Sequence, residues 1–105
     1  MITADLCIIP MGIEESGLGE YVAKAVQIIE ESGLNYQLTA MGTQIESNDL
    51  KQLYAVCASV QEAIFEMGVP RVYTVLKIDD RRDKENGTLE EKIKSVKNRM
   101  WMMKN

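Results

Sequence analysis

Residues 41–46 (MGTQIE) place a glycine, a hydroxyl, an amide and a carboxylate within six positions, between two short strand-like runs. Thr43, Gln44 and Glu46 can exchange hydrogen bonds with the edge of a polar heterocycle, and Glu46 can also attract a cation. Gly42 lets the backbone bend sharply or approach a ligand closely. From residue types alone, a hairpin that ends in a solvated carboxylate is the better interpretation, because exposed carboxylates are common.

A second charged segment, residues 79–83, places three aspartates around Arg81 and Arg82. Either arginine is a candidate for binding phosphate or sulfate, because a guanidinium group holds such anions with two parallel hydrogen bonds. Adjacent aspartates can also hold a metal ion, but two carboxylates without further ligand spacing do not predict one. Surface ion pairs, which contribute little energy, explain this segment better.

The residues on which the commonest catalytic and metal sites depend are missing. The chain has no histidine, and its two cysteines, Cys7 and Cys57, are far apart in the sequence. The Ser/His and Cys/His arrangements of nucleophilic catalysis are therefore excluded, as is a Cys/His zinc site. We expect a protein that is not an enzyme, holds no metal and requires no cofactor.

Length and charge point to an ordinary soluble protein. The chain has 105 residues, with 46% hydrophobic and 27% charged residues, which is typical of one globular domain spanning residues 1–105. Its net charge of −4 argues against nucleic acid, because neutralising phosphates requires surplus Lys and Arg. There is no membrane-length apolar run and no basic signal-peptide start. We expect a cytoplasmic protein that binds neither nucleic acid nor membrane.

Hydrophobic periodicity predicts the order of the secondary structure. Two-residue alternation indicates strands at residues 4–10, 35–40, 43–47 and 71–80, and helical spacing indicates helices at 18–31, 50–67 and after Thr88. Gly33 and Gly68 follow the first two helices, where a left-handed residue commonly ends a helix. The order βαββαβ with an added C-terminal helix predicts an α+β, ferredoxin-like sandwich with a four-stranded antiparallel sheet.

The two faces of this sheet have different expected partners. The core under the helices should contain Leu6, Ile8, Leu38, Ile45, Val72, Leu76 and Ile78. The opposite face carries Cys7 and Ile9 on the first strand and Tyr73 and Val75 on the fourth. A face exposed to water should be polar at these positions, so apolar residues there predict a buried contact. We prefer a homo-oligomer interface to a ligand platform.

The C-terminal helix has a narrow apolar stripe of nearly heptad spacing: Leu89, Ile93, Val96, Met100 and Met103. We expect its Met-rich end to pack on the core or on a neighbouring subunit, since methionine fills irregular gaps readily. Its lysines and arginine leave a membrane-surface role as a lesser alternative.

Several short segments, in order over nearly the whole chain, carry a resemblance to a known family. They are residues 8–12 (IIPMG), 21–23 (YVA), 32–36 (SGLNY), 41–46 (MGTQIE), 71–74 (RVYT), 77–83 (KIDDRRD) and 92–96 (KIKSV). Together they are similar to the small thiamine-binding-protein family, which is distantly related to duplicated-domain binders of thiamine and hydroxymethylpyrimidine. This chain has Gln61 and Glu62 where many members have a His-Glu pair.

The resemblance implies a ferredoxin-like fold, a homotetramer built from sheet-to-sheet dimers, and binding of thiamine or its hydroxymethylpyrimidine part without catalysis. For such a ligand, Thr43, Gln44 and Glu46 would contact the polar edge. The apolar walls would be Ile9, Met11, Tyr36 and Met41. The alternative is a structural or regulatory homo-oligomer without a small ligand.

Overall fold

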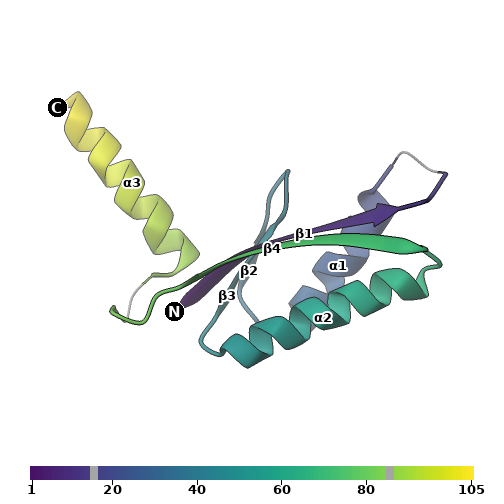
Figure 1. Ribbon diagram of the computed structural model, residues 1–105. Coiled ribbons are helices and arrows are strands. Elements are labelled where there is room, and N and C mark those ends of the chain that lie inside the picture. The colour runs from purple at the N-terminus through teal and green to yellow at the C-terminus, as the bar shows by residue number, and fades with distance from the viewer. Residues whose placement is uncertain (15–16, 85–86) are drawn as a thin grey trace.

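The computed structural model describes residues 1–14, 17–84 and 87–105. Its elements are, in order, β1 (Ile2–Met11), α1 (Gly19–Glu31), β2 (Tyr36–Leu38), β3 (Thr43–Ser47), α2 (Leu50–Glu66), β4 (Arg71–Asp80) and α3 (Leu89–Lys104). The four strands form one antiparallel sheet, and α1 and α2 lie on the same side of it (Figure 1). This is the predicted ferredoxin-like α+β arrangement with an additional C-terminal helix.

The order of strands in the sheet is β2-β3-β1-β4. β1 pairs with β4 along its whole length, from Ile2 opposite Asp80 to Met11 opposite Arg71. Its pairing with β3 stops at Leu6, which lies opposite Thr43. The second half of β1 therefore has a strand partner on one side only, and the chain on the other side turns away into the β2–β3 hairpin.

The core lies between the sheet and the two helices that cover it. Its fully buried side chains come from α1, β3 and α2: Ile29, Ile45, Leu53, Val60 and Ile64. Leu6 is buried as predicted, and the other predicted strand residues Ile8, Val72, Leu76 and Ile78 are partly buried against the core.

Leu38 corrects one sequence-based expectation. It was predicted to be a core residue, but 55% of it is exposed. The reason is that β2 is shorter than predicted and ends at Leu38, on the outermost strand of the sheet. The side chain borders a cavity there instead of the packed core.

Helix α3 projects away from the rest of the molecule (Figure 1), and the longest dimension of the whole molecule, α3 included, is 52 Å. It begins as predicted: the Thr88 hydroxyl accepts a hydrogen bond from the backbone N–H of Glu91. Its residues do not pack on the core of the same chain, since none of them is buried. No helix in the described ranges is long and apolar enough to span a bilayer.

Candidate functional site

The residues predicted to bind a ligand lie in different hollows of the structure. Ile9, Met41 and Thr43 line a cavity of about 300 Å³ beneath the tip of the β2–β3 hairpin, which we call the hairpin cavity. Tyr36 and Glu46 line a cleft between the hairpin and α3, which we call the α3 cleft. The remaining two residues, Gln44 and Met11, lie outside both.

The hairpin cavity is apolar and built from three elements. Its lining comes from residues 6–9 of β1, from Leu18, which directly precedes α1, from the α1 side chains Val22, Ala25 and Ile29, and from residues 38–43 of the hairpin. The side of β1 that faces it has lost its strand partner beyond Leu6. Backbone N–H and C=O groups on this side of β1 therefore lack a ladder partner, and they provide polar contacts in an apolar wall.

No charged side chain of the described residues lines the hairpin cavity. Its side-chain hydroxyls are those of Thr39 and Thr43. Thr39 already donates to the Gly42 carbonyl at 2.7 Å, an interaction that holds the hairpin tip closed. The cavity thus suits an uncharged, mainly apolar group with a few polar atoms at its edge.

Gly42 allows the hairpin tip to lie directly on β1. A Cβ at this position would collide with Oδ1 of Asp5 and come within 3.1 Å of the Leu6 carbonyl oxygen. Its backbone is not in the left-handed region, so the requirement for glycine is one of space. The sequence analysis had allowed for either a sharp bend or a close approach, and the structure shows the close approach, to the chain's own β1.

Glu46 is 7% exposed, and both of its carboxylate oxygens have donors within the chain. Oε1 accepts from the backbone N–H of Leu89 at 2.5 Å, and Oε2 accepts from Nδ2 of Asn35 at 2.9 Å. A carboxylate at the first turn of a helix also interacts favourably with the helix dipole. Glu46 therefore attaches α3 to the hairpin, a role that the sequence analysis missed.

Tyr36, on the other side of the α3 cleft, points its hydroxyl at Glu30. The O–H donates to Oε2 of that carboxylate at 2.6 Å, and this hydrogen bond raises the pKa of Tyr36. Glu46, expected at the polar edge of a ligand, and the hydroxyl of Tyr36, expected as an apolar wall, thus both have internal partners.

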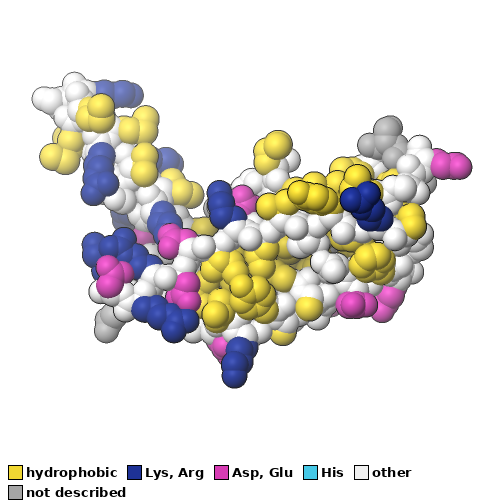
Figure 2. All heavy atoms as spheres, viewed as in Figure 1, with side chains coloured by type: hydrophobic (Ala, Val, Ile, Leu, Met, Phe, Trp, Pro, Cys, Tyr) yellow, Lys and Arg dark blue, Asp and Glu magenta, His cyan; other side chains and the backbone are white. Residues whose placement is uncertain are grey.

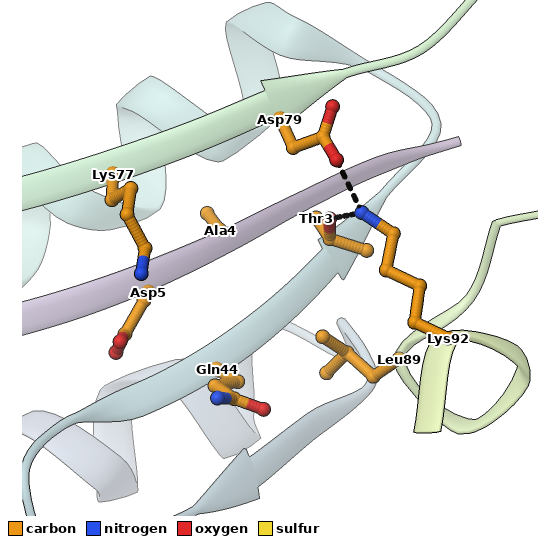
Figure 3. Close-up of a pocket in the computed structure, with 8 residues that line it drawn as sticks. All are labelled: Thr3, Ala4, Asp5, Gln44, Lys77, Asp79, Leu89 and Lys92. Atoms are coloured by element: carbon orange, nitrogen blue, oxygen red, sulfur yellow. Dashed lines mark hydrogen bonds and ion pairs between the residues drawn. The ribbon is translucent and has the colours of Figure 1, made fainter. Parts of the chain in front are cut away.

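A third hollow lies on the sheet face opposite α1 and α2 and contains Gln44 (Figure 3). Here the ammonium of Lys92 donates to Thr3 Oγ1 at 2.7 Å and to Asp79 Oδ2 at 2.5 Å, which ties the first turn of α3 to β1 and β4. Oδ1 of Asp5 is buried and has no hydrogen-bond partner among the described residues. Met11, at the far end of β1, is 36% exposed.

The charged segment after β4 forms local ion pairs. Arg81 Nε lies 2.8 Å from Asp83 Oδ1, and Arg82 Nη2 lies 2.7 Å from Asp80 Oδ2. The hydrogen bonds from the arginines lower the pKa of both aspartates. This is the arrangement that the ion-pair interpretation expects, while anion binding by either arginine stays a prediction.

The residues predicted to form an oligomer interface lie together on the outer face of the sheet. Cys7 is opposite Val75 and Ile9 is opposite Tyr73 in the β1–β4 pair. Tyr73 is 53% exposed and Val75 45% exposed, and the two β1 residues are half-buried. With the neighbouring Met11, these residues form an apolar surface that we call the outer patch.

Gln61 accepts a hydrogen bond from the Thr74 hydroxyl at 2.6 Å and so joins α2 to β4. Within residues 1–14, 17–84 and 87–105, no three or more His, Cys, Asp or Glu side chains are grouped so that they could hold a metal ion.

Comparisons with known proteins agree with the fold and with the resemblance. A family profile described as "Thiamine-binding protein" matches residues 4–97. A UPF0045 protein of Methanothermobacter thermautotrophicus is 43% identical over 95% of this chain and 100% of its own length. The UPF0045 protein YqgV of Bacillus subtilis is 47% identical over 91% of this chain and 94% of its own.

Solved structures show the same fold. A hypothetical protein of Methanocaldococcus jannaschii superimposes with a TM-score of 0.81 at 35% identity, covering 90% of this chain and 94% of that one. A Thermotoga maritima protein, whose name refers to thiamine biosynthesis or salvage, has a TM-score of 0.76 at 21% identity, over 90% of this chain and 97% of that one. The profile match and the identities to the curated relatives together show that the chain belongs to the thiamine-binding protein family.

Proposed function

We propose that this protein is a non-catalytic, cytoplasmic carrier or sensor that binds thiamine or a related aminopyrimidine in the hairpin cavity. The observation that carries the proposal is the position of this cavity. It is an apolar space bordered by three of the residues expected to contact such a ligand, Ile9, Met41 and Thr43. The family name and the name of the Thermotoga maritima protein support the ligand class.

The lining of the cavity indicates which part of thiamine would enter it. A volume of about 300 Å³ is at the lower end for small-molecule sites, so it suits one ring better than a long molecule. The uncharged lining favours the neutral aminopyrimidine ring, because a cation without a paired charge would lose hydration on entering. The cationic thiazolium ring would stay at the opening, on a protein whose net charge is −4.

A pair of substitutions on α1 tests this location. Val22 lines the cavity, whereas Ala23 is exposed on the same helix and does not. We expect Val22→Phe to fill the cavity and weaken hydroxymethylpyrimidine binding by at least about tenfold, a loss of roughly 1.4 kcal/mol, in calorimetric titration. Ala23→Phe serves as the matched control and should bind like the parent. Equal binding by the two variants would place the ligand elsewhere.

Glu46 distinguishes the hairpin cavity from the α3 cleft. If Glu46 accepts a hydrogen bond from the ligand's amino group, as the sequence suggested, Glu46→Gln should weaken binding by about ten- to a hundredfold. If the ligand occupies the hairpin cavity, affinity should change little, because Glu46 lines the α3 cleft and not that cavity. The same titration therefore tells the two locations apart.

We also propose that the protein is a homo-oligomer, specifically a tetramer, which assembles through the outer patch. The exposed Tyr73 and Val75 side chains support this assembly. The second candidate function is that of a structural or regulatory oligomer without a small ligand. No heat of binding from the parent protein with millimolar thiamine, thiamine phosphates or hydroxymethylpyrimidine would favour it.

A further inference from the structure

The unpaired half of β1 forms one wall of the hairpin cavity. The pairing of β1 with β3 runs from Ile2 to Leu6 and ends there. Residues 7–9, which follow, line the cavity together with the hairpin tip. Which of their backbone N–H and C=O groups point towards the missing strand follows from the hydrogen-bonding pattern of the sheet.

The β2–β3 hairpin fixes that pattern. The N–H of Glu46 donates to the carbonyl oxygen of Asn35, so Glu46 directs its backbone groups towards β2. Hydrogen-bonded and non-bonded pairs alternate along an antiparallel ladder, so neighbouring residues direct their groups to opposite sides. Ile45 and Thr43 therefore direct theirs towards β1, where Thr43 lies opposite Leu6. Leu6 is thus the last β1 residue that exchanges hydrogen bonds with β3.

Ile8 is the next β1 residue whose N–H and C=O point to the same side as those of Leu6. The register of β1 with β4 continues without a bulge, so Ile8 and Thr74 face each other as a non-bonded pair. Outside the sheet, no backbone group of the described residues bonds to Ile8. Its N–H and C=O are therefore a donor and an acceptor without partners on the side of the hairpin cavity, which Ile8 lines. Such groups lower the free energy when a bound molecule pairs with them.

Pro10, the next residue on this side, limits what can bind. It has no N–H, so the free edge offers one complete donor–acceptor pair, at Ile8, and then only a carbonyl group. An added β-strand uses a pair at every second residue, so it would lose a hydrogen bond at Pro10. A single ring with an acceptor next to a donor needs only the pair at Ile8, and the cavity of about 300 Å³ has room for one ring.

We infer that the backbone of Ile8 recognises the ligand: its N–H donates to a ring nitrogen and its C=O accepts from the adjacent amino group of an aminopyrimidine. This inference rests on the ligand location proposed above and names the atoms that select the ring. Figure 2 shows hydrophobic side chains at the tip of the β2–β3 hairpin and along the β1–β4 pair. Hydrogen bonds are electrostatically stronger in apolar surroundings than in water, and an unpaired polar group costs more there.

NMR tests the hydrogen bond from the Ile8 N–H directly. In the ligand-free protein, this N–H should exchange with deuterium faster than the N–H of Leu6, which is bonded to β3. In the complex with isotope-labelled hydroxymethylpyrimidine, we expect a coupling across the hydrogen bond between the Ile8 amide nitrogen and a ring nitrogen. Equal protection of Ile8 and Leu6 without ligand, or coupling of the ring to a different amide, would overturn the inference.

Calorimetric titration with ligand analogues tests the Ile8 carbonyl. An analogue with hydrogen in place of the amino group should bind at least about tenfold more weakly than hydroxymethylpyrimidine, because it leaves this carbonyl buried and unpaired. The matched control has methyl in place of hydroxymethyl, the position where thiamine continues towards the cavity opening, and should bind like the parent compound. Equal affinity for the analogue without the amino group would show that Ile8 does not read it.

These measurements separate the role of Ile8 from the proposed function. If hydroxymethylpyrimidine does not bind the parent protein, both proposals fail. If it binds and Val22→Phe weakens the binding, but the Ile8 amide shows no coupling to the ring, the hairpin cavity is the site and only the assignment of Ile8 fails.

Discussion

Cys57 shows how burial alone sets the chemistry of a side chain. The residue is 6% exposed in the helix–sheet core, and burial raises the pKa of its thiol from 9.0 to about 11. The thiolate is the reactive form, so the folded protein should protect Cys57 from thiol reagents. In a Cys7→Ser variant, we expect no rapid thiol reaction at about pH 8 in the native state and one reactive thiol after denaturation. Rapid labelling of the native variant would show that this part of the core opens.

The raised pKa of Cys57 also fixes the direction of a stability change. Burial favours the protonated thiol, so its contribution to stability is fully present below pH 9, the thiol's ordinary pKa. This stability is lost as the pH rises towards about 11, the pKa of Cys57 in the folded protein. Between these two pH values the Cys57 thiol ionises readily only in the unfolded chain, which favours unfolding.

Glu46 marks the limit of sequence reasoning at the level of single residues. Its segment was singled out correctly as polar and unusual, but its partner Leu89 is 43 residues further along the chain. Local patterns predict helix caps that come from the adjacent residue, as Thr88 does for α3. A carboxylate supplied by a distant strand becomes apparent only when the tertiary structure is known.

The β2–β3 hairpin is the element whose geometry depends most on one residue. Gly42→Ala would push a Cβ into Asp5 and the Leu6 carbonyl, so the tip must lift from β1. We expect a loss of about 1–3 kcal/mol in the free energy of unfolding, measured by urea denaturation. The control is Gly19→Ala, where a Cβ meets nothing within 4 Å and α1 begins. A matching loss in both variants would contradict this account of the hairpin.

The elements themselves were largely predictable because their periods are clear. The boundaries of β3 and β4 were predicted exactly as observed, and the glycines after α1 and α2 are left-handed, with φ of 80° at Gly33 and 92° at Gly68. The length of β2 was not predicted. Its alternation continues past Leu38 in the sequence, but the strand ends where Thr39 and Gly42 close the turn.

At the scale of the whole molecule, the outer patch predicts that assembly can be broken without unfolding the chain. Val75→Glu places a charge in an apolar surface, which should cost several kcal/mol where that surface is buried between copies. We expect a smaller particle by light scattering with an unchanged circular dichroism spectrum. Ala55→Glu, on the exposed side of α2, should leave the assembly intact. A parent protein that stays monomeric at micromolar concentration would remove the basis for the interface.

The full-length pairing of β1 with β4 has a consequence for synthesis of the protein. β1 leaves the ribosome before the other three strands, yet it lies inside the sheet, and its partner on one side, Arg71–Asp80, is the last of the four to emerge. Until β4 has emerged, the ten-residue β1 has a bare hydrogen-bonding edge, which is a template for pairing with other chains. The nascent chain should therefore depend on chaperones until Asp80 has emerged, even though the finished fold is small.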